Sequence, residues 1–126
     1  MPQKTGNFDY FDCESYKKAI QLSVMTQKRH QSGKINFQKL ADHCQIQKTY
    51  LSRVLNENSI KAHLSSDQLY LASEFLSLTA DESRFLTLLY ERERTQLEKR
   101  KKVLSRQIET LRVKNLKSEK VLNSQK

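Results

Sequence analysis

The stretch from Gln47 to Asn56 carries side chains that can hydrogen-bond to nucleic-acid bases and phosphates, and it contains no acidic residue. In a helix, Leu51, Val54 and Leu55 would share one face, which leaves the opposite face polar. Arginine can bond guanine twice, asparagine can bond adenine twice, and hydroxyls and lysines reach base edges or phosphates. The candidate DNA-contacting residues are Gln47, Lys48, Thr49, Ser52, Arg53 and Asn56.

Other kinds of chemistry have little support in the sequence. His43 stands beside Cys44, but no second pair follows at metal-ligand spacing. There is no Gly-rich phosphate loop and no nucleophile with a recognisable base. We therefore expect no catalytic residues, no metal, no cofactor and no enzyme activity. The two cysteines, Cys13 and Cys44, are expected to be small core residues, although the sequence leaves their redox state open.

Helices are the elements expected to position these side chains. The 126 residues suffice for one compact domain with an appendage, and 2 Gly and 1 Pro are too few for a turn-rich β fold. Two capping-box spacings mark helix starts. The expected helices run from Asp12 to Arg29, from Asn36, from Gln47 to Asn56, from Ser65 (box with Gln68) and from Thr79 (box with Glu82). Ile60 and Leu64, in the loop before Ser65, are expected to pack against the core.

The second and third helices have the apolar spacing of a helix-turn-helix. Relative to Ala41, this spacing resembles that of Cro- and lambda-repressor-type (Xre-like) proteins, and its apolar positions are Leu40, Cys44, Ile46, Leu51 and Val54. Two residues depart from that pattern. Phe37 stands where Gln is favoured, and Gln45 stands where Gly would allow a turn with positive φ. A plain pair of amphipathic helices is the alternative interpretation.

A narrower resemblance includes these departures. The segments "NFDYFDCESYKKAI" and "INFQKLADHCQIQKTYLSRVLNENSIKAHLSSDQLYLASEFLSLTADESRFLTLLYERER" are similar to the N-terminal half of a large paralogous family of bacterial transcriptional regulators. That family carries an aromatic residue at the position of Phe37 and a "Y-L-S-x-V" third helix, here Tyr50 to Val54. The resemblance covers about residues 8 to 94 and implies a DNA-binding domain. The family's C-terminal domain, whose role is uncharacterised, has no counterpart here.

These observations predict an all-α fold with two parts. A compact five-helix Xre-like helix-turn-helix domain is expected at residues 8–92. Beyond Tyr90 the composition becomes strongly charged, with no Gly or Pro to end the last helix. We therefore expect that helix to protrude as a basic, coiled-coil-forming extension at residues 93–118, followed by a disordered tail at 119–126.

The expected extension carries a heptad pattern. Leucines recur every seven residues, and Ile108 and Asn115 fall at the paired heptad positions. This spacing predicts a homodimer with a parallel seam, although Lys101 at a core position favours the alternative of a solvated helix. The expected seam residues are Leu97, Leu104, Ile108, Leu111 and Asn115.

Positive charge is concentrated outside the helix-turn-helix. Of the formal net charge of +9, residues 91–126 contribute 12 basic and 5 acidic side chains, whereas residues 35–90 contribute 5 and 6. A basic-zipper fork is disfavoured because the first leucine precedes the basic cluster. The candidate phosphate contacts are Gln38, Lys61, Lys99, Arg100 and Lys102.

The sequence thus favours a DNA-binding transcriptional regulator. Its partner would be double-stranded DNA, read by the third helix in the major groove, with half-sites of a homodimer about 34 Å apart. A protein-interaction module without DNA binding, and a non-specific nucleic-acid binder driven by the basic tail, are the alternatives. No apolar run reaches signal-peptide or membrane-span length, so we expect a cytoplasmic protein that does not bind membranes. The operator and any small-molecule effector are left open.

Overall fold

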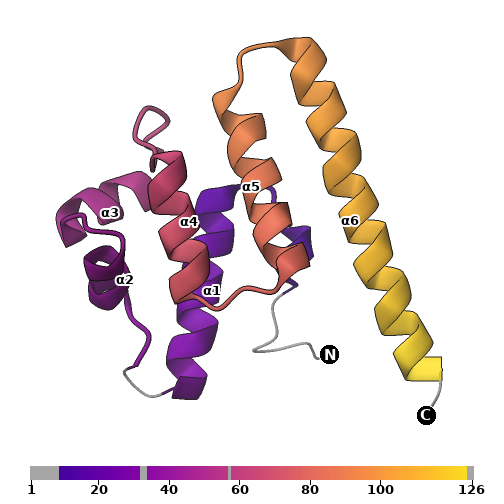
Figure 1. Ribbon diagram of the computed structural model, residues 1–126, viewed down its shortest axis with the longest axis horizontal. Helices are drawn as coiled ribbons and strands as arrows, with labels where there is room; N and C mark the ends of the chain where they lie inside the picture. The colour runs from indigo at the N-terminus through magenta and orange to yellow at the C-terminus, as the bar shows by residue number, and fades with distance from the viewer. Residues whose placement is uncertain (1–8, 32–33, 57, 125–126) are drawn as a thin grey trace.

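The computed structural model describes residues 9–31, 34–56 and 58–124. This part of the chain is entirely helical and contains no strand, which confirms the all-α prediction. Figure 1 shows the arrangement, with α6 at one end of the molecule and α2 and α3 at the other. The elements are η1 (Tyr10–Asp12, a 3-10 helix), α1 (Tyr16–Gln31), α2 (Phe37–His43), α3 (Lys48–Leu55), α4 (Ser66–Phe75), α5 (Ala80–Arg94) and α6 (Glu98–Ser124).

Side-chain caps start α2, α4 and α5 where the sequence predicted. Asn36 accepts a hydrogen bond from the Lys39 amide at the start of α2, and both capping boxes, at Ser65 and Thr79, are formed. The prediction that the first helix begins at Asp12 was wrong. Asp12 ends η1, and α1 begins at Tyr16, whose amide donates to a Glu93 carboxylate oxygen from α5 at 2.8 Å.

Helix α1 forms the centre of the core, in contact with α3 and with α5. Tyr16, Ile20 and Val24 are essentially inaccessible to solvent, as are Phe85 and Leu89 of α5. Leu64, in the loop between α3 and α4, is fully buried as predicted. Ile60 in the same loop is 76% exposed, so the prediction that it packs against the core was wrong. The tip of this loop therefore projects away from the domain.

The protruding helix expected from the sequence is not present. Helix α5 ends at Arg94, Thr95 adopts an extended conformation (ψ 145°), and α6 begins at Glu98 after a short turn. Helix α6 then runs back along α5 (Figure 1). Because α6 packs against α5, residues 93–118 are not a separate extension. Residues 119–124, expected to be disordered, form the last turns of α6. Residue 8, where the domain was expected to begin, and residues 125 and 126, at the end of the expected tail, lie outside the described residues.

The expected dimer seam is instead an intramolecular contact. Leu104, Ile108 and Leu111 are buried within the chain's own core. Leu97 is 66% exposed, and Asn115 donates its side-chain amide to the Leu111 carbonyl one turn earlier on the same helix. A parallel dimer through these residues would require α6 to leave α5. The heptad pattern correctly located an apolar stripe, and within this chain the stripe packs in the core beside α5.

Arg112 joins α6 to the N-terminal segment. Its guanidinium donates to the Phe11 carbonyl at 2.6 Å and to the Cys13 carbonyl at 2.9 Å, and it pairs with the Glu14 carboxylate at 3.1 Å. It also lies 5.6 Å from the centre of the Phe85 ring. One side chain thus holds η1, α5 and α6 together, by charge-assisted bonds that are stronger than neutral ones.

Both cysteines are buried free thiols. Burial raises the pKa of Cys13 and of Cys44 to about 11 in each case, so both are protonated at neutral pH. Within the described residues, no helix is long and apolar enough to cross a membrane.

Candidate nucleic-acid interface

Helix α3 has one buried face and one exposed face. Leu51, Val54 and Leu55 are buried against the domain. All six candidate DNA-contacting residues are exposed, and the exposed face of the helix centres on Thr49 and Arg53. The helix therefore presents polar, non-acidic side chains to solvent while its apolar side fixes it to the core. The exposed residues are Gln47, Lys48, Thr49, Ser52, Arg53 and Asn56.

The turn between α2 and α3 has the geometry that the sequence left in doubt. Gln45 takes a φ of 64°, in the left-handed region that glycine would occupy most easily. Its amide donates to the Asp42 carbonyl, and the Ile46 amide donates to the Ala41 carbonyl at 3.0 Å. This pair of bonds forms a Schellman motif. The helix-turn-helix spacing is thus kept without glycine, by a residue held in a disfavoured conformation.

Arg53 is positioned by an aromatic neighbour one turn earlier. Its guanidinium carbon lies 5.7 Å from the centre of the Tyr50 ring, within cation–π range. The Tyr50 hydroxyl donates to the His63 carbonyl at 2.9 Å, which ties α3 to the loop that follows it. Sequence reasoning missed this role of Tyr50. Its spacing of three residues from Arg53 was the available signal.

Asn56 is partly committed to the local backbone. Its side-chain oxygen accepts a hydrogen bond from the Asn58 amide at 2.9 Å. Two-bond recognition of adenine needs both the oxygen and the amide nitrogen of an asparagine. The bond from Asn58 uses one of the two lone pairs of that oxygen and fixes the orientation of the side chain, so Asn56 can read adenine only in an orientation that keeps this bond.

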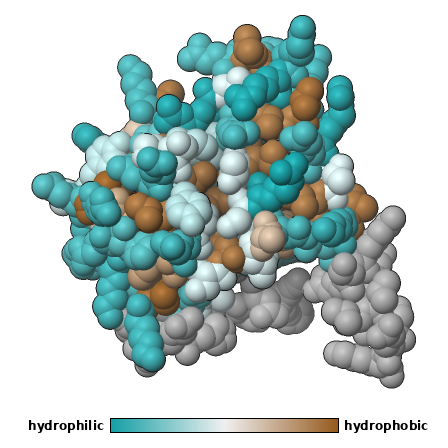
Figure 2. Space-filling model, viewed as in Figure 1, coloured by the Kyte–Doolittle hydropathy of each residue, from teal (hydrophilic) through white to brown (hydrophobic). Residues whose placement is uncertain are grey.

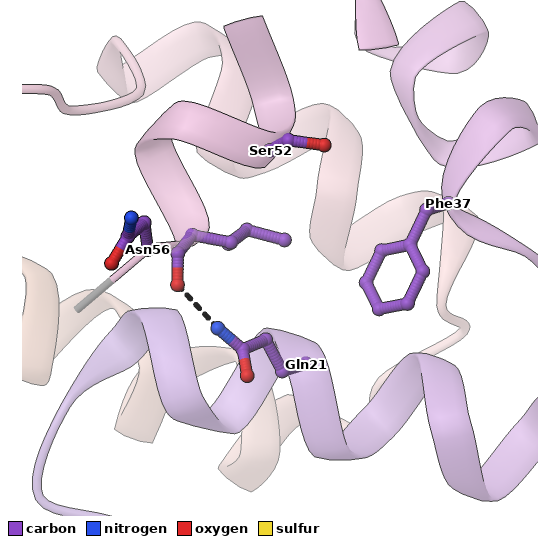
Figure 3. Close-up of a pocket in the computed structure, with 5 residues that line it drawn as sticks. Gln21, Phe37, Ser52 and Asn56 are labelled. Carbon is purple, nitrogen blue, oxygen red and sulfur yellow. Dashed lines mark hydrogen bonds between the residues drawn. The ribbon is translucent and has the colours of Figure 1, made fainter. Parts of the chain in front are cut away.

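A shallow hollow of about 230 Å³ lies beside α3 and is lined from α1, α2 and the end of α3. The Gln21 side-chain amide of α1 donates to the Leu55 carbonyl at the end of α3, and the Phe37 ring stands across from it (Figure 3). Ser52 and Asn56 border the same hollow. Phe37 is therefore a wall residue between helices, in place of the polar contact that Xre-like proteins favour there.

The loop after α3 is held by a polar network around Tyr16. The Tyr16 hydroxyl lies 2.9 Å from Nδ1 of His63 and accepts from the Leu64 amide at 3.3 Å. Nε2 of His63 lies 3.1 Å from the Ile60 carbonyl, and the Lys17 ammonium donates to the Ser59 carbonyl at 2.8 Å. Because a carbonyl can only accept, Nε2 carries the proton and Nδ1 accepts from Tyr16.

This environment favours the neutral form of His63. Burial, with the charges of Lys17 and Arg94 nearby, lowers the pKa of its imidazole below the usual value. The neutral ring is the form that can accept the Tyr16 bond and so hold the loop. The loop that carries Lys61 is thereby fixed relative to α3.

The five candidate phosphate contacts do not lie together. Lys61 is exposed in the loop after α3, and Gln38 is exposed on α2 but donates to Asp42 at 3.0 Å. The other three are on α6, at the opposite end of the molecule from α3 (Figure 1), so they do not form one continuous cluster with α3. These three are Lys99, Arg100 and Lys102.

Among the described residues, no group of three or more His, Cys, Asp and Glu side chains is arranged to hold a metal ion. His43 pairs instead with Glu74 at 2.9 Å, and the Cys44 thiol donates to the Gln68 carbonyl. Comparisons of the chain with protein-family models, with curated proteins and with solved structures found no match.

Proposed function

We propose that the protein is a DNA-binding transcriptional regulator in which α3 enters the major groove. The observation that supports this most is the two-sided character of α3: a buried face that fixes the helix and an exposed face of base-reading side chains without an acidic group. A major groove admits one α-helix, and the N-terminal residues of a recognition helix contact the base edges. In α3 these are Lys48 and Thr49.

The remaining side chains divide between bases and backbone. Arg53 lies on the exposed face and can take guanine O6 and N7 together. Asn56 and Lys61 suit phosphates, because the Asn56 amide nitrogen is a donor at the C-terminal end of α3 and Lys61 stands on the loop beyond α3. An Xre-like relationship remains part of the proposal, supported by the left-handed turn at Gln45.

Selection from a random duplex pool tests this function. The intact chain should enrich a defined sequence, and Arg53→Ala should bind that sequence about 5- to 150-fold more weakly, the discrimination expected of one bidentate arginine–guanine pair. Arg84→Ala is the matched control, since Arg84 is an exposed arginine on α5. Its affinity should equal that of the intact chain. No enriched sequence, or equal losses in the two variants, would refute the proposal and favour a protein-interaction module.

The selected sequence also tests the predicted homodimer. A palindrome with half-sites about 34 Å apart would indicate two copies. A single half-site would indicate that one chain binds alone. A dimer that keeps the α5–α6 contact must form through a surface other than Leu104, Ile108 and Leu111, because these are buried in the chain itself.

A further inference from the structure

The cations of α6 whose side chains the structure describes, from Lys99 to Lys114, fall into two groups. On the sides that border α5 and η1 they are neutralised by carboxylates of the same chain. Arg112 pairs with Glu14 and Glu109. The other pairs are Arg100 with Glu91 at 3.3 Å, Lys101 with Glu98 at 3.3 Å and Lys114 with Asp81 at 3.2 Å. These four cations make ion pairs within the chain.

Lys99, Lys102 and Arg106 form the second group, which we call the outer cations of α6. All three are exposed, and none of the ion pairs within the described residues includes them. Their spacing of three and four residues places them on one face, opposite the buried Leu104 and Ile108. At a rise of about 1.5 Å per residue they span about 10 Å along the helix axis. They therefore make a short straight row of uncompensated positive charge.

This row faces away from α3. Helix α6 packs on α5 through its buried face, and α3 lies at the far end of the molecule (Figure 1). Figure 2 shows hydrophilic side chains projecting from the upper part of α6 at the edge of the molecule. A duplex bound to α3 therefore leaves the outer cations exposed.

We propose that the outer cations of α6 form a second, sequence-independent phosphate-binding surface that takes a DNA duplex other than the one read by α3. The role of α3 in this arrangement rests on the function proposed above. Three cations on a convex helix fit a phosphate backbone, which needs positive charge and no groove. A membrane is a poorer partner, because surface binding needs a continuous apolar helix face. The apolar stripe of Leu104, Ile108 and Leu111 is buried in the core, and the exposed Val103, Val113 and Leu116 are scattered around the helix.

Two variants of the full chain separate this role from general charge. The outer variant combines Lys99→Gln, Lys102→Gln and Arg106→Gln. The control variant combines Arg100→Gln, Lys101→Gln and Lys114→Gln, which removes the same charge from the same helix but from ion-paired positions. The first readout is binding of a site-free labelled duplex at 50 and 200 mM salt. If the outer cations make three phosphate contacts, their contribution to the binding constant should fall about 40-fold between 50 and 200 mM salt. This corresponds to a slope of about −2.7 in a plot of log binding constant against log salt concentration.

The outer variant should lose this part of the salt dependence, and the control variant should keep more than half of this part of the slope. The second readout is bridging: an immobilised duplex with the selected sequence, saturated with protein, should capture the site-free duplex, and the outer variant should not. Equal slopes for the outer variant and the intact chain would overturn the proposal. So would binding to vesicles of phosphatidylcholine and phosphatidylserine that is lost in the outer variant while its DNA slope is unchanged.

These measurements distinguish two hypotheses: that α3 binds a specific DNA sequence, and that the outer cations of α6 bind phosphates. If α3 does not read DNA, no sequence is enriched and bridging cannot be set up, yet the salt dependence of site-free binding still depends on the outer cations. If only α6 is misassigned, Arg53→Ala still loses the selected sequence, and the outer variant binds site-free duplex like the intact chain.

Discussion

Ile108→Ala tests whether α6 belongs to the domain core. Ile108 is fully buried and packs in the same core as the side chains of α5. Truncating a buried isoleucine to alanine costs about 2–5 kcal/mol, because apolar contacts are lost and a cavity remains. With a urea dependence of about 1.5 kcal/mol per M, a loss of roughly 3.5 kcal/mol lowers the unfolding midpoint by roughly 2 M.

Val103→Ala is the matched control, because Val103 lies on the same helix but is 43% exposed. We expect its midpoint to fall by much less, since surface substitutions usually stay within about 0.5 kcal/mol. Both variants should be measured by urea unfolding, followed by circular dichroism, at two protein concentrations a hundredfold apart. Equal losses in the two variants would show that Ile108 does not pack in the core of its own chain. A midpoint that depends on concentration would by itself show only that the chain associates.

Two further predictions concern the surroundings of α3. Gln45→Gly should raise the free energy of unfolding by about 1 kcal/mol, because glycine adopts the left-handed conformation of this position without strain. The control Gln107→Gly, inside α6, should lower the free energy of unfolding by about 1 kcal/mol. A lower free energy of unfolding for Gln45→Gly would contradict the turn geometry. Because the pKa of His63 is lowered on folding, the unfolded chain binds more protons below about pH 6.5, so the free energy of unfolding falls as the pH drops through that region. His63→Asn keeps an acceptor for Tyr16, and urea unfolding at pH 7.5 and 5.5 should show a smaller loss at low pH than the intact chain; an unchanged pH dependence would exclude His63 as its source.

The features that sequence reasoning placed correctly depend on neighbours in the chain. The capping boxes at Ser65 and Thr79 each join residues three apart, so no tertiary information was needed. The exposed face of α3 followed from the helical period in the same way. The predicted start of the first helix at Asp12 was wrong. The start of α1 is capped by Glu93 of α5, which is 77 residues away in the chain and could not be predicted from neighbouring residues.

The α5–α6 contact could not be predicted for a related reason. A heptad pattern shows that one side of a helix is apolar, but it does not show what covers that side. The turn between the helices contains no Gly or Pro that would have indicated it in the sequence. Thr95 ends α5 in an extended conformation, which any residue can adopt. The role of Arg112 was also invisible, because it bonds to backbone carbonyls, which every residue carries.

The bonds of Arg112 also have a consequence for synthesis of the chain. The Phe11 carbonyl and its partner Arg112 are separated by 101 residues, so η1 is made well before the side chain that anchors it. At a typical elongation rate the ribosome needs roughly 5 to 20 s to reach the second from the first. During that interval α1 to α5 can assemble, but the face of α5 that η1 and α6 later cover stays open to water and to chaperones. The nascent chain therefore has a defined period of exposure that ends only when α6 emerges.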